Sequence, residues 1–246
     1  EPDRTPIFEK LIKSPVADEL LGRPCSASNH EFRMQRLADG DWEGLELQAG
    51  EDLVDLACAI GFDAIRLYPN GLPPTPESRP RRLSDGTWQV GNTITEQLPG
   101  GWLRSRSVAP SPPVGDEEAE AAFRRSLDGP VPMPHYEDRH FIMYRHARKL
   151  MAERGVDLAI FSETYRLGVA TLPESVLRWF ACEPELVERY YTRQHRQAVP
   201  VIERLIAEGA DIVALGGDLA SDLGPMISPQ HYARLITPFM REQSRL

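Results

Sequence analysis

The 246-residue sequence has few cysteines and lacks any long apolar run. Its three cysteines, Cys25, Cys58 and Cys182, lie far apart, so they indicate neither a disulfide framework nor a C-x-x-C metal site. No stretch approaches the roughly 20 consecutive apolar residues of a membrane span. The charged start, residues 1–4, is not typical of a signal peptide. We therefore expect a cytoplasmic protein without a membrane partner.

The sequence also has fewer basic than acidic residues. The chain has 28 Lys and Arg against 37 Asp and Glu, for a net charge of -9. Nucleic-acid binding requires clustered Lys and Arg to contact phosphates, so this balance argues against a nucleic-acid partner. Two local runs, residues 79–82 and 104–106, remain compatible with an acidic ligand. Charge runs of this kind more often face solvent.

The hydrophobic residues, 41% of the chain, follow a repeated order of helix, glycine, short apolar strand and polar loop. Such alternation predicts a parallel sheet covered by helices, wound either as a barrel or as an open sheet. The expected glycine stops are Gly61, Gly155 and Gly209. The three predicted helix–strand pairs are 53–60 with 63–68, 136–154 with 157–162, and 184–208 with 210–215.

Other segments differ from this pattern. Residues 5–8 are an apolar run after a turn and predict a first strand. Residues 71–115 are rich in Pro and Gly, and Asp85-Gly86 between short apolar runs predicts a hairpin with a type I′ turn. A polar helix is expected over residues 116–127. Ser228, followed by a proline at the first helical position, predicts the start of the last helix.

The strongest motif lies in residues 209–239. Residues 208–213, 217–220, 224–229 and 232–239 match the pattern E-G-A-D-x-V, D-x-A, G-P-x-I-S-P and a late proline. This block resembles uroporphyrinogen decarboxylase and its corrinoid- and coenzyme-M-methyltransferase relatives. Weaker matches are residues 3–7 with the D-R-x-P-V opening of the family, residues 61–65 with the entry to its second strand, and residues 161–163 and 172–174 with its third.

The resemblance implies a (β/α)8 TIM barrel with its site at the carboxyl ends of the strands. Only about four barrel strands are recognisable in residues 1–246. We therefore expect one barrel domain, truncated at its C-terminus to about the first half, with residues 71–115 as a hairpin excursion. An open half barrel leaves unpaired strand edges, so a fragment or a chain that pairs with a second half is expected.

The same resemblance bears on the chemistry. In the decarboxylases, which use no cofactor, an Asp at the end of the second strand binds pyrrole N–H groups and stabilises a cationic intermediate. Asn70 stands in its place, and an amide has no negative charge. Leu11 and Pro15 stand where the family has arginines for substrate carboxylates. The sequence therefore resembles the superfamily better than it resembles that enzyme.

The methyltransferase branch uses zinc, held by His and Cys, to make a thiolate nucleophile. Those ligands would lie beyond Leu246. We therefore expect no metal or cofactor in this chain, whereas zinc and a corrinoid remain compatible with a full-length relative.

Candidate site residues follow from the position of each strand end. We expect catalytic roles for Asp218, Asn70 and Glu163. The alternatives are a turn-capping Asp218 and a loop salt bridge at Glu163. Arg66 within a strand must either line the site or pair with an acid such as Glu9, because an unpaired buried charge is costly. The candidate substrate-binding residues are Arg66, Tyr68, Tyr165, Arg166 and Asp222.

The first functional hypothesis is a divergent methyltransferase or demethylase that acts with a corrinoid or another methyl carrier. The second is decarboxylation of uroporphyrinogen in tetrapyrrole biosynthesis. The third, from a different class, is a non-catalytic remnant or binding protein. The expected partners are a small-molecule substrate, with a tetrapyrrole or a corrinoid protein as the alternatives, and a second copy of the chain in a homodimer.

Overall fold

The structure, a computed structural model, describes residues 4–109, 116–164, 167–168, 172 and 177–246. The chain divides into two units. The first holds residues 1–111 and 136–161, and the second holds residues 112–135 and 162–246. A single barrel domain over residues 1–246 stays a prediction.

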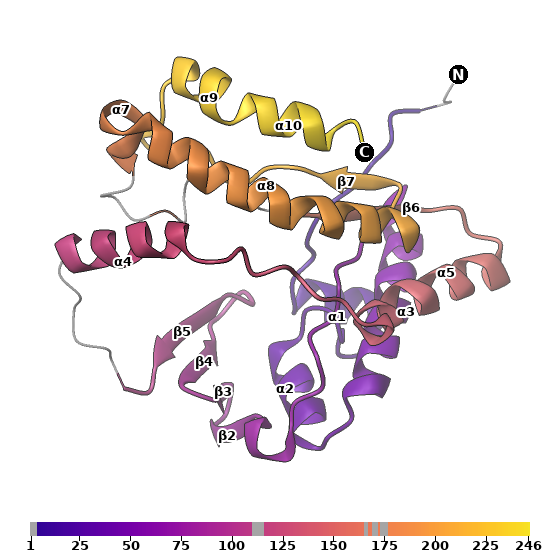
Figure 1. Cartoon of the computed structure of the whole chain (residues 1–246). Coiled ribbons are helices and arrows are strands. Elements are labelled where there is room, and N and C mark those ends of the chain that lie inside the picture. Colours follow the sequence, from indigo (N-terminus) through magenta and orange to yellow (C-terminus); the bar gives the residue numbers. More distant parts are fainter. Residues whose placement is uncertain (1–3, 110–115, 165–166, 169–171, 173–176) are drawn as a thin grey trace. The chain divides into compact units, whose positions relative to one another are not determined.

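Most of the predicted helix–strand order is present in the first unit (Figure 1). Its elements are α1 (Val16–Leu21), α2 (His30–Ala38), α3 (Trp42–Ile60), β1 (Ala64–Arg66), η1 (Pro76–Ser78), β2 (Arg81–Ser84), β3 (Thr87–Val90), β4 (Thr93–Gln97), β5 (Leu103–Ser107), η2 (Asp138–Phe141), α5 (Ile142–Arg154) and β6 (Ala159–Glu163).

The glycine stops fix where β1 and β6 begin. Gly61 and Gly155 are the left-handed C-caps of α3 and α5, a conformation that glycine adopts without steric cost. The two strands that follow pair in parallel, with Ala64 opposite Ala159. Their central residues, Ile65 and Ile160, are buried. The parallel pairing predicted from the repeated order is therefore present.

Residues 81–107 form a four-stranded antiparallel sheet with the order β2-β3-β4-β5, so the predicted hairpin is present. Its turn is not type I′. That turn requires positive φ at both central residues, whereas only Gly86 has one, at 69°. One face of the sheet packs on α2. The Trp88 Nε1 donates to Glu31 Oε2 over 2.6 Å, and His30 Nε2 lies 2.9 Å from Thr95 Oγ1.

The predicted first strand at residues 5–8 is wrong. This segment is extended but is not a strand, and a backbone hydrogen bond from Asp63 N to Ile7 O joins it to the start of the β1 region. The Asp63 carboxylate provides the other contacts, because it accepts from Ile7 N over 2.6 Å and from both terminal nitrogens of Arg4. A side chain, not a strand ladder, holds the N-terminal segment.

The second unit is mainly helical. Its elements are α4 (Asp116–Asp128), the end of β6, α7 (Trp179–Cys182), α8 (Pro184–Ala207), β7 (Ile212–Ala214), β8 (Ala220–Ser221), β9 (Gly224–Pro225), α9 (Pro229–Leu235) and α10 (Thr237–Gln243). As predicted, Pro184 opens the long helix, and Ser228 caps α9 through its hydroxyl, which accepts from His231 N.

Helix α8 organises this unit, and α9 and α10 run along it (Figure 1). Its outer arginines also hold the segment that leads away from α4. Arg193 donates to the carbonyl oxygens of Gly129 and Pro130 over 2.6 and 3.0 Å. Buried aromatic and aliphatic side chains fill the interior, among them Trp179, Phe180 and Tyr191.

The described residues thus form a mixed α/β structure that contains a parallel sheet, and they do not close a barrel. Strand β6 takes part in both units. Its first residues pair with β1, and just beyond its end Thr164 N donates to Ala214 O of β7 over 3.1 Å. No helix within the described ranges is both long and apolar enough to cross a membrane.

The N-terminal segment provides a first prediction. The backbone N–H of Ile7 and the Arg4 guanidinium hold the pKa of Asp63 below its ordinary value of 3.8. A carboxyl with a depressed pKa stabilises the contact above that ordinary value and loses it as the pH falls through the lower one. The protection of residues 4–12 against hydrogen exchange, taken relative to an unstructured peptide at the same pH, should therefore be present at pH 5 and be lost in strong acid.

The variant Asp63→Asn should have lost this protection already at pH 5, and its protection should change little with pH. Asp157→Asn, at an exposed position, is the matched control and should behave as the unmodified chain. Identical pH profiles for the unmodified chain and Asp63→Asn would contradict this account.

Candidate functional site

A pocket in the first unit lies between the N-terminal segment, α3 and β1. Its space amounts to about 530 Å³, counting the part open to solvent. Most of its wall is apolar, contributed by α3 and β1. The lining residues are Glu9, Lys10, Leu11, Ile12, Cys25, Ala27, Ser28, Leu53, Leu56, Ala57, Phe62, Ala64, Ile65, Arg66 and Tyr68.

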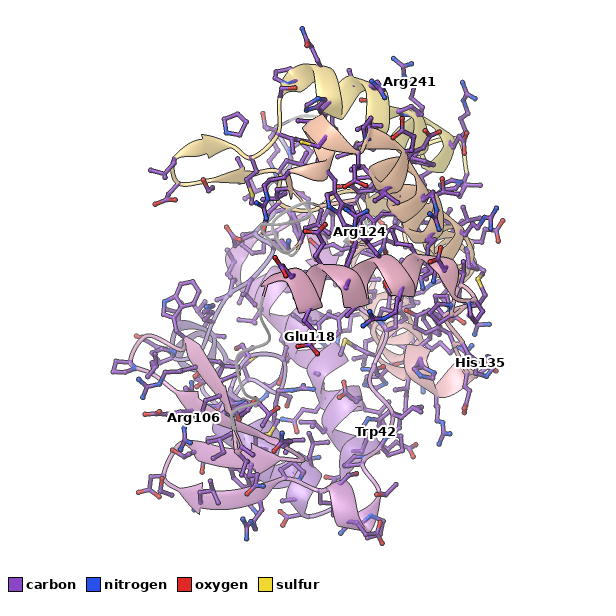
Figure 2. All side chains as sticks on the ribbon, turned by 60° about the vertical axis from the view of Figure 1, so that its left-hand side comes forward. Trp42, Arg106, Glu118, Arg124, His135 and Arg241 are labelled. Carbon is purple, nitrogen blue, oxygen red and sulfur yellow. The ribbon has the colours of Figure 1, made fainter. Side chains whose placement is uncertain are left out.

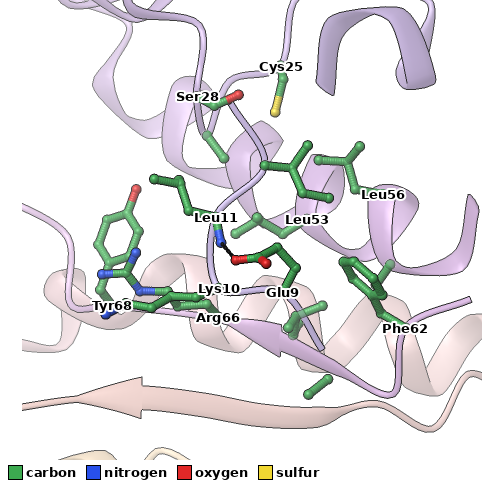
Figure 3. A pocket seen from close by; sticks show the side chains of 15 residues that line it. Glu9, Lys10, Leu11, Cys25, Ser28, Leu53, Leu56, Phe62, Arg66 and Tyr68 are labelled. Carbon is green, nitrogen blue, oxygen red and sulfur yellow. Dashed lines mark hydrogen bonds between the residues drawn. The ribbon is translucent and has the colours of Figure 1, made fainter. Parts of the chain in front are cut away.

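Charged and phenolic groups gather at one end of this pocket (Figure 3). Arg66 ends β1 and Tyr68 follows two residues later, so both point to the same side of the extended chain. The guanidinium carbon of Arg66 lies 5.9 Å from the centroid of the Tyr68 ring. Glu9 lies on the same pocket, and its Oε1 accepts from Leu11 N over 3.3 Å. The structure thus brings together two predicted site residues and the acid named as a partner for Arg66.

The opposite wall includes Cys25, which the sequence did not single out. Its side chain is fully buried, and Figure 3 shows the sulfur directed toward the pocket. Burial raises the pKa of the Cys25 thiol, so the thiol stays protonated and weakly nucleophilic at neutral pH. Lys10 was missed as well. Both residues lie in irregular segments that no periodic pattern marks.

Asn70 occupies a buried polar site at the end of the β1 segment. Its Nδ2 donates to Glu46 Oε2 over 2.5 Å, and its Oδ1 accepts from Met143 N over 3.3 Å. Its backbone N–H donates to His140 O over 2.6 Å. The amide joins α3 to the start of α5, with only 2% of the residue exposed. A role of Asn70 toward substrate stays a prediction.

The predicted carboxylates of the second unit follow the ends of β6 and β7. Glu163 is the last residue of β6 and is half-buried. Asp218 lies four residues after β7 and is exposed. Asp222 is exposed in the turn between β8 and β9. The predicted ligand contacts Tyr165 and Arg166 lie outside the described residues. Catalytic roles for these carboxylates stay predictions.

A close crossing of two backbone segments holds the chain just before Asp218. Leu167 N donates to Gly216 O over 3.1 Å, and Tyr191 Oη donates to Gly168 O over 3.3 Å. A Cβ added to Gly217 would lie 2.5 Å from the Cα of Gly168. Gly217 also has a φ of 151°, which side chains rarely adopt. Only glycine fits here, and this crossing sets the path into Asp218.

A metal ion does not fit the described residues. Within the ranges that the structure describes, no three His, Cys, Asp or Glu side chains are placed to hold one. A zinc-bound thiolate therefore has no ligand set among the residues that the structure describes.

Comparisons with known proteins give little direct guidance. No family model matches the chain, and no curated protein matches it. Among solved structures, a methyltransferase from Methanosarcina mazei is similar, with a TM-score of 0.42 and 16% sequence identity over 96% of this chain and 67% of that chain. At these values the likeness establishes neither the family nor the activity of this protein.

The environment of Asn70 predicts the effect of placing an aspartate there. Asn70→Asp replaces the donor to Glu46 with a second carboxylate in a buried site, and leaving a buried charge uncompensated costs about 3 kcal/mol. The free energy of unfolding should fall by about that amount at neutral pH, and by less in mild acid, where the pair can share a proton. Chemical denaturation at pH 7 and pH 5 measures both values.

A second substitution tests whether the loss of stability in Asn70→Asp comes from the repulsion between two carboxylates and not from the altered side chain. Glu46→Gln combined with Asn70→Asp restores one donor and one acceptor, so the double variant should be more stable than Asn70→Asp alone. Asn92→Asp, on the exposed turn between β3 and β4, is the matched control and should leave stability nearly unchanged. Equal stability of Asn70→Asp and the unmodified chain would refute the buried contact.

The crossing at Gly217 gives another prediction. Gly217→Ala introduces a methyl group too close to Gly168 and forces alanine into a disfavoured φ, so the free energy of unfolding should fall by about 2 kcal/mol or more. Gly129→Ala is the control, because its added Cβ meets only Ser126 O at 3.8 Å. Thermal unfolding of both variants measures this effect. Equal melting temperatures for Gly217→Ala and Gly129→Ala would contradict the close backbone contact at Gly217.

Proposed function

We propose that this chain is an enzyme of the uroporphyrinogen decarboxylase superfamily, from the branch that transfers or removes methyl groups with a corrinoid or another methyl carrier. The support is the block at residues 208–239 together with parallel strands whose ends carry polar side chains. In this proposal the parallel strands belong to a TIM-type barrel, of which the chain supplies about the first half.

The buried amide of Asn70 is the observation on which we base the choice between methyl transfer and decarboxylation. Decarboxylation of a porphyrinogen in this superfamily needs a carboxylate at that strand end, to stabilise a cationic ring. Asn70 is neutral, and its amide already bonds Glu46 and Met143 N. The Asn70 amide is neutral and its donor and acceptor already bond to protein groups, so it does not supply this negative charge. The arrangement therefore favours the methyl-transfer branch over decarboxylation.

The roles of the chain's own residues follow from their surroundings. In the first unit, Arg66 and Tyr68 line the pocket as the candidate substrate-binding residues, and apolar side chains from α3 and β1 make up most of its wall. In the second unit, Asp218 is exposed on the loop after β7, where a carboxylate can accept or return a proton. Glu163, at the neighbouring strand end, is the second candidate for this role.

The test compares the two chemistries on the same preparation. The chain is incubated with methylcobalamin and a small thiol, and loss of the methyl–cobalt absorbance is recorded. A parallel sample receives uroporphyrinogen, and carbon dioxide release is recorded. We expect demethylation above the protein-free rate and no carbon dioxide. Asp218→Asn should lower the demethylation rate about tenfold or more, since removal of a general acid–base group typically costs at least that much.

Asp157→Asn, an exposed aspartate in the first unit, is the matched control and should keep the full rate. Carbon dioxide release from uroporphyrinogen would establish the decarboxylase alternative instead. Absence of both activities in a folded preparation would contradict an enzymatic role and leave the binding protein as the surviving hypothesis.

A further inference from the structure

We infer that the outer edge of strand β5 is a docking site for a partner protein, which adds an extended acidic segment there as a fifth strand of the antiparallel sheet. The site lies in the first unit, and none of its residues takes part in the proposed function.

Every second residue of β5 directs its backbone N–H and C=O away from β4. At the two ends of the ladder, Leu98 N donates to Trp102 O over 2.7 Å and Val108 N donates to Asn92 O over 2.9 Å. Hydrogen-bonded and non-hydrogen-bonded pairs alternate along an antiparallel ladder, and the pairing of β5 with β4 has no shift. The residues whose backbone groups point outward are therefore Leu103, Ser105 and Ser107. In the part of the chain that the structure describes, these groups bond to no other segment.

Strand β5 is the regular one of the two outer strands of this sheet. The pairing of β2 with β3 shifts between Arg82 and Ser84, and irregularities of this kind oppose further pairing at an edge. All five residues of β5 are exposed. Extended peptides add to regular, exposed edges of this kind, where main-chain hydrogen bonds provide the affinity.

The turn before β5 holds an exposed aromatic side chain in place. Trp102 is 65% exposed, and Lys13 Nζ lies 2.9 Å from the centroid of its ring. A Cβ added to Gly101 would overlap Ser14 O, so the turn packs closely against the N-terminal segment. Tryptophan is enriched among the residues that contribute most to protein interfaces, and a side chain that is already held loses less entropy on binding.

The charges along β5 favour an acidic segment over a second copy of β5. Side chains alternate along a strand, so Arg104 and Arg106 lie on the same side as Trp102. Arg104 pairs with Glu96 over 2.5 Å, whereas Arg106 is exposed and has no ion pair among the described residues. Two copies of β5 paired antiparallel about Ser105 would place Arg104 opposite Arg106. Like charges directly opposite each other are destabilising, and a carboxylate beside Arg106 is stabilising.

The test uses two peptides with blocked ends that differ only in the sign of their charge, Ser-Val-Glu-Val-Glu-Val-Leu and Ser-Val-Lys-Val-Lys-Val-Leu. Paired antiparallel to residues 102–108, each places its charged residues beside the two arginines and its leucine beside Trp102. Each peptide carries the same fluorescent label, and anisotropy with the whole chain gives its Kd. We expect the glutamate peptide to bind about tenfold more tightly, although the net charge of -9 by itself favours the lysine peptide.

Hydrogen exchange followed by NMR locates the bound peptide. The amides of Leu103, Ser105 and Ser107 should gain protection, relative to an unstructured peptide, when the glutamate peptide saturates the chain. The amides of Arg104 and Arg106 face β4 already, so their protection should change little.

Ser105→Pro removes one outward N–H and leaves the ladder with β4 intact, so the glutamate peptide should bind about tenfold more weakly or not at all. Ser105→Ala keeps this N–H and is the matched control, with unchanged affinity. If Ser105→Pro unfolds, Arg106→Glu takes its place and should make the lysine peptide the tighter ligand. Its control is Arg241→Glu, at an exposed position on α10 (Figure 2), which should keep the preference for glutamate.

Three results would overturn the inference. The first is equal or tighter binding of the lysine peptide to the unmodified chain. The second is binding of the glutamate peptide without protection of the three outward amides, or no binding at all. The third is a dimer of the peptide-free chain in which the same three amides are protected, because β5 would then pair with its own copy.

Discussion

The first unit depends on the buried contact between Glu46 and Asn70. A carboxylate with 3% exposure is tolerated only when charges and donors surround it. Arg33 supplies the charge from α2 over 2.9 Å, and Asn70 supplies a donor from the end of the β1 segment. Because Asn70 also accepts from Met143 N, one network fixes two helices, the start of α5 and the strand end. Arg66 and Tyr68 lie just before this anchor, so it also holds one side of the pocket.

In the second unit, a close crossing of two backbone segments takes the place of a buried ion network. The backbone approach of Gly168 and Gly217 leaves no room for a side chain, and Tyr191 of α8 bonds to Gly168 O. Burial raises the pKa of that phenol well above its usual range, so it remains a neutral donor at any physiological pH. The loop that carries Asp218 therefore starts from a fixed point, although Asp218 itself is exposed. Rigid anchors next to accessible polar groups are the general arrangement of sites at strand ends.

The Glu46–Asn70 contact and the Gly168–Gly217 crossing each lie next to candidate site residues. The buried amide of Asn70 is bonded within the scaffold, to Glu46 and to Met143 N. The pocket of the first unit is lined by Glu9, Lys10, Arg66 and Tyr68 beside an aliphatic wall. Burial raises the pKa of the Cys25 thiol on the same pocket, so this thiol stays protonated at neutral pH. Proton transfer would fall to the carboxylates after β6 and β7.

The sequence by itself determined α3, α4, α5 and α8, the glycine stops of α3 and α5, and the parallel strands, because periodicity and capping are properties of neighbouring residues. It also marked Arg66 and Tyr68, which share one side of a strand through simple alternation. It did not mark α1, α2 or α7, and it predicted one last helix where the structure has α9 and α10. Only the tertiary structure decided that residues 5–8 form no strand, since a strand exists only where a partner offers its backbone. It likewise decided that Asn70 bonds Glu46 and that Lys10 and Cys25 share a pocket with Arg66. These residues are far apart along the chain, and only packing brings their side chains together.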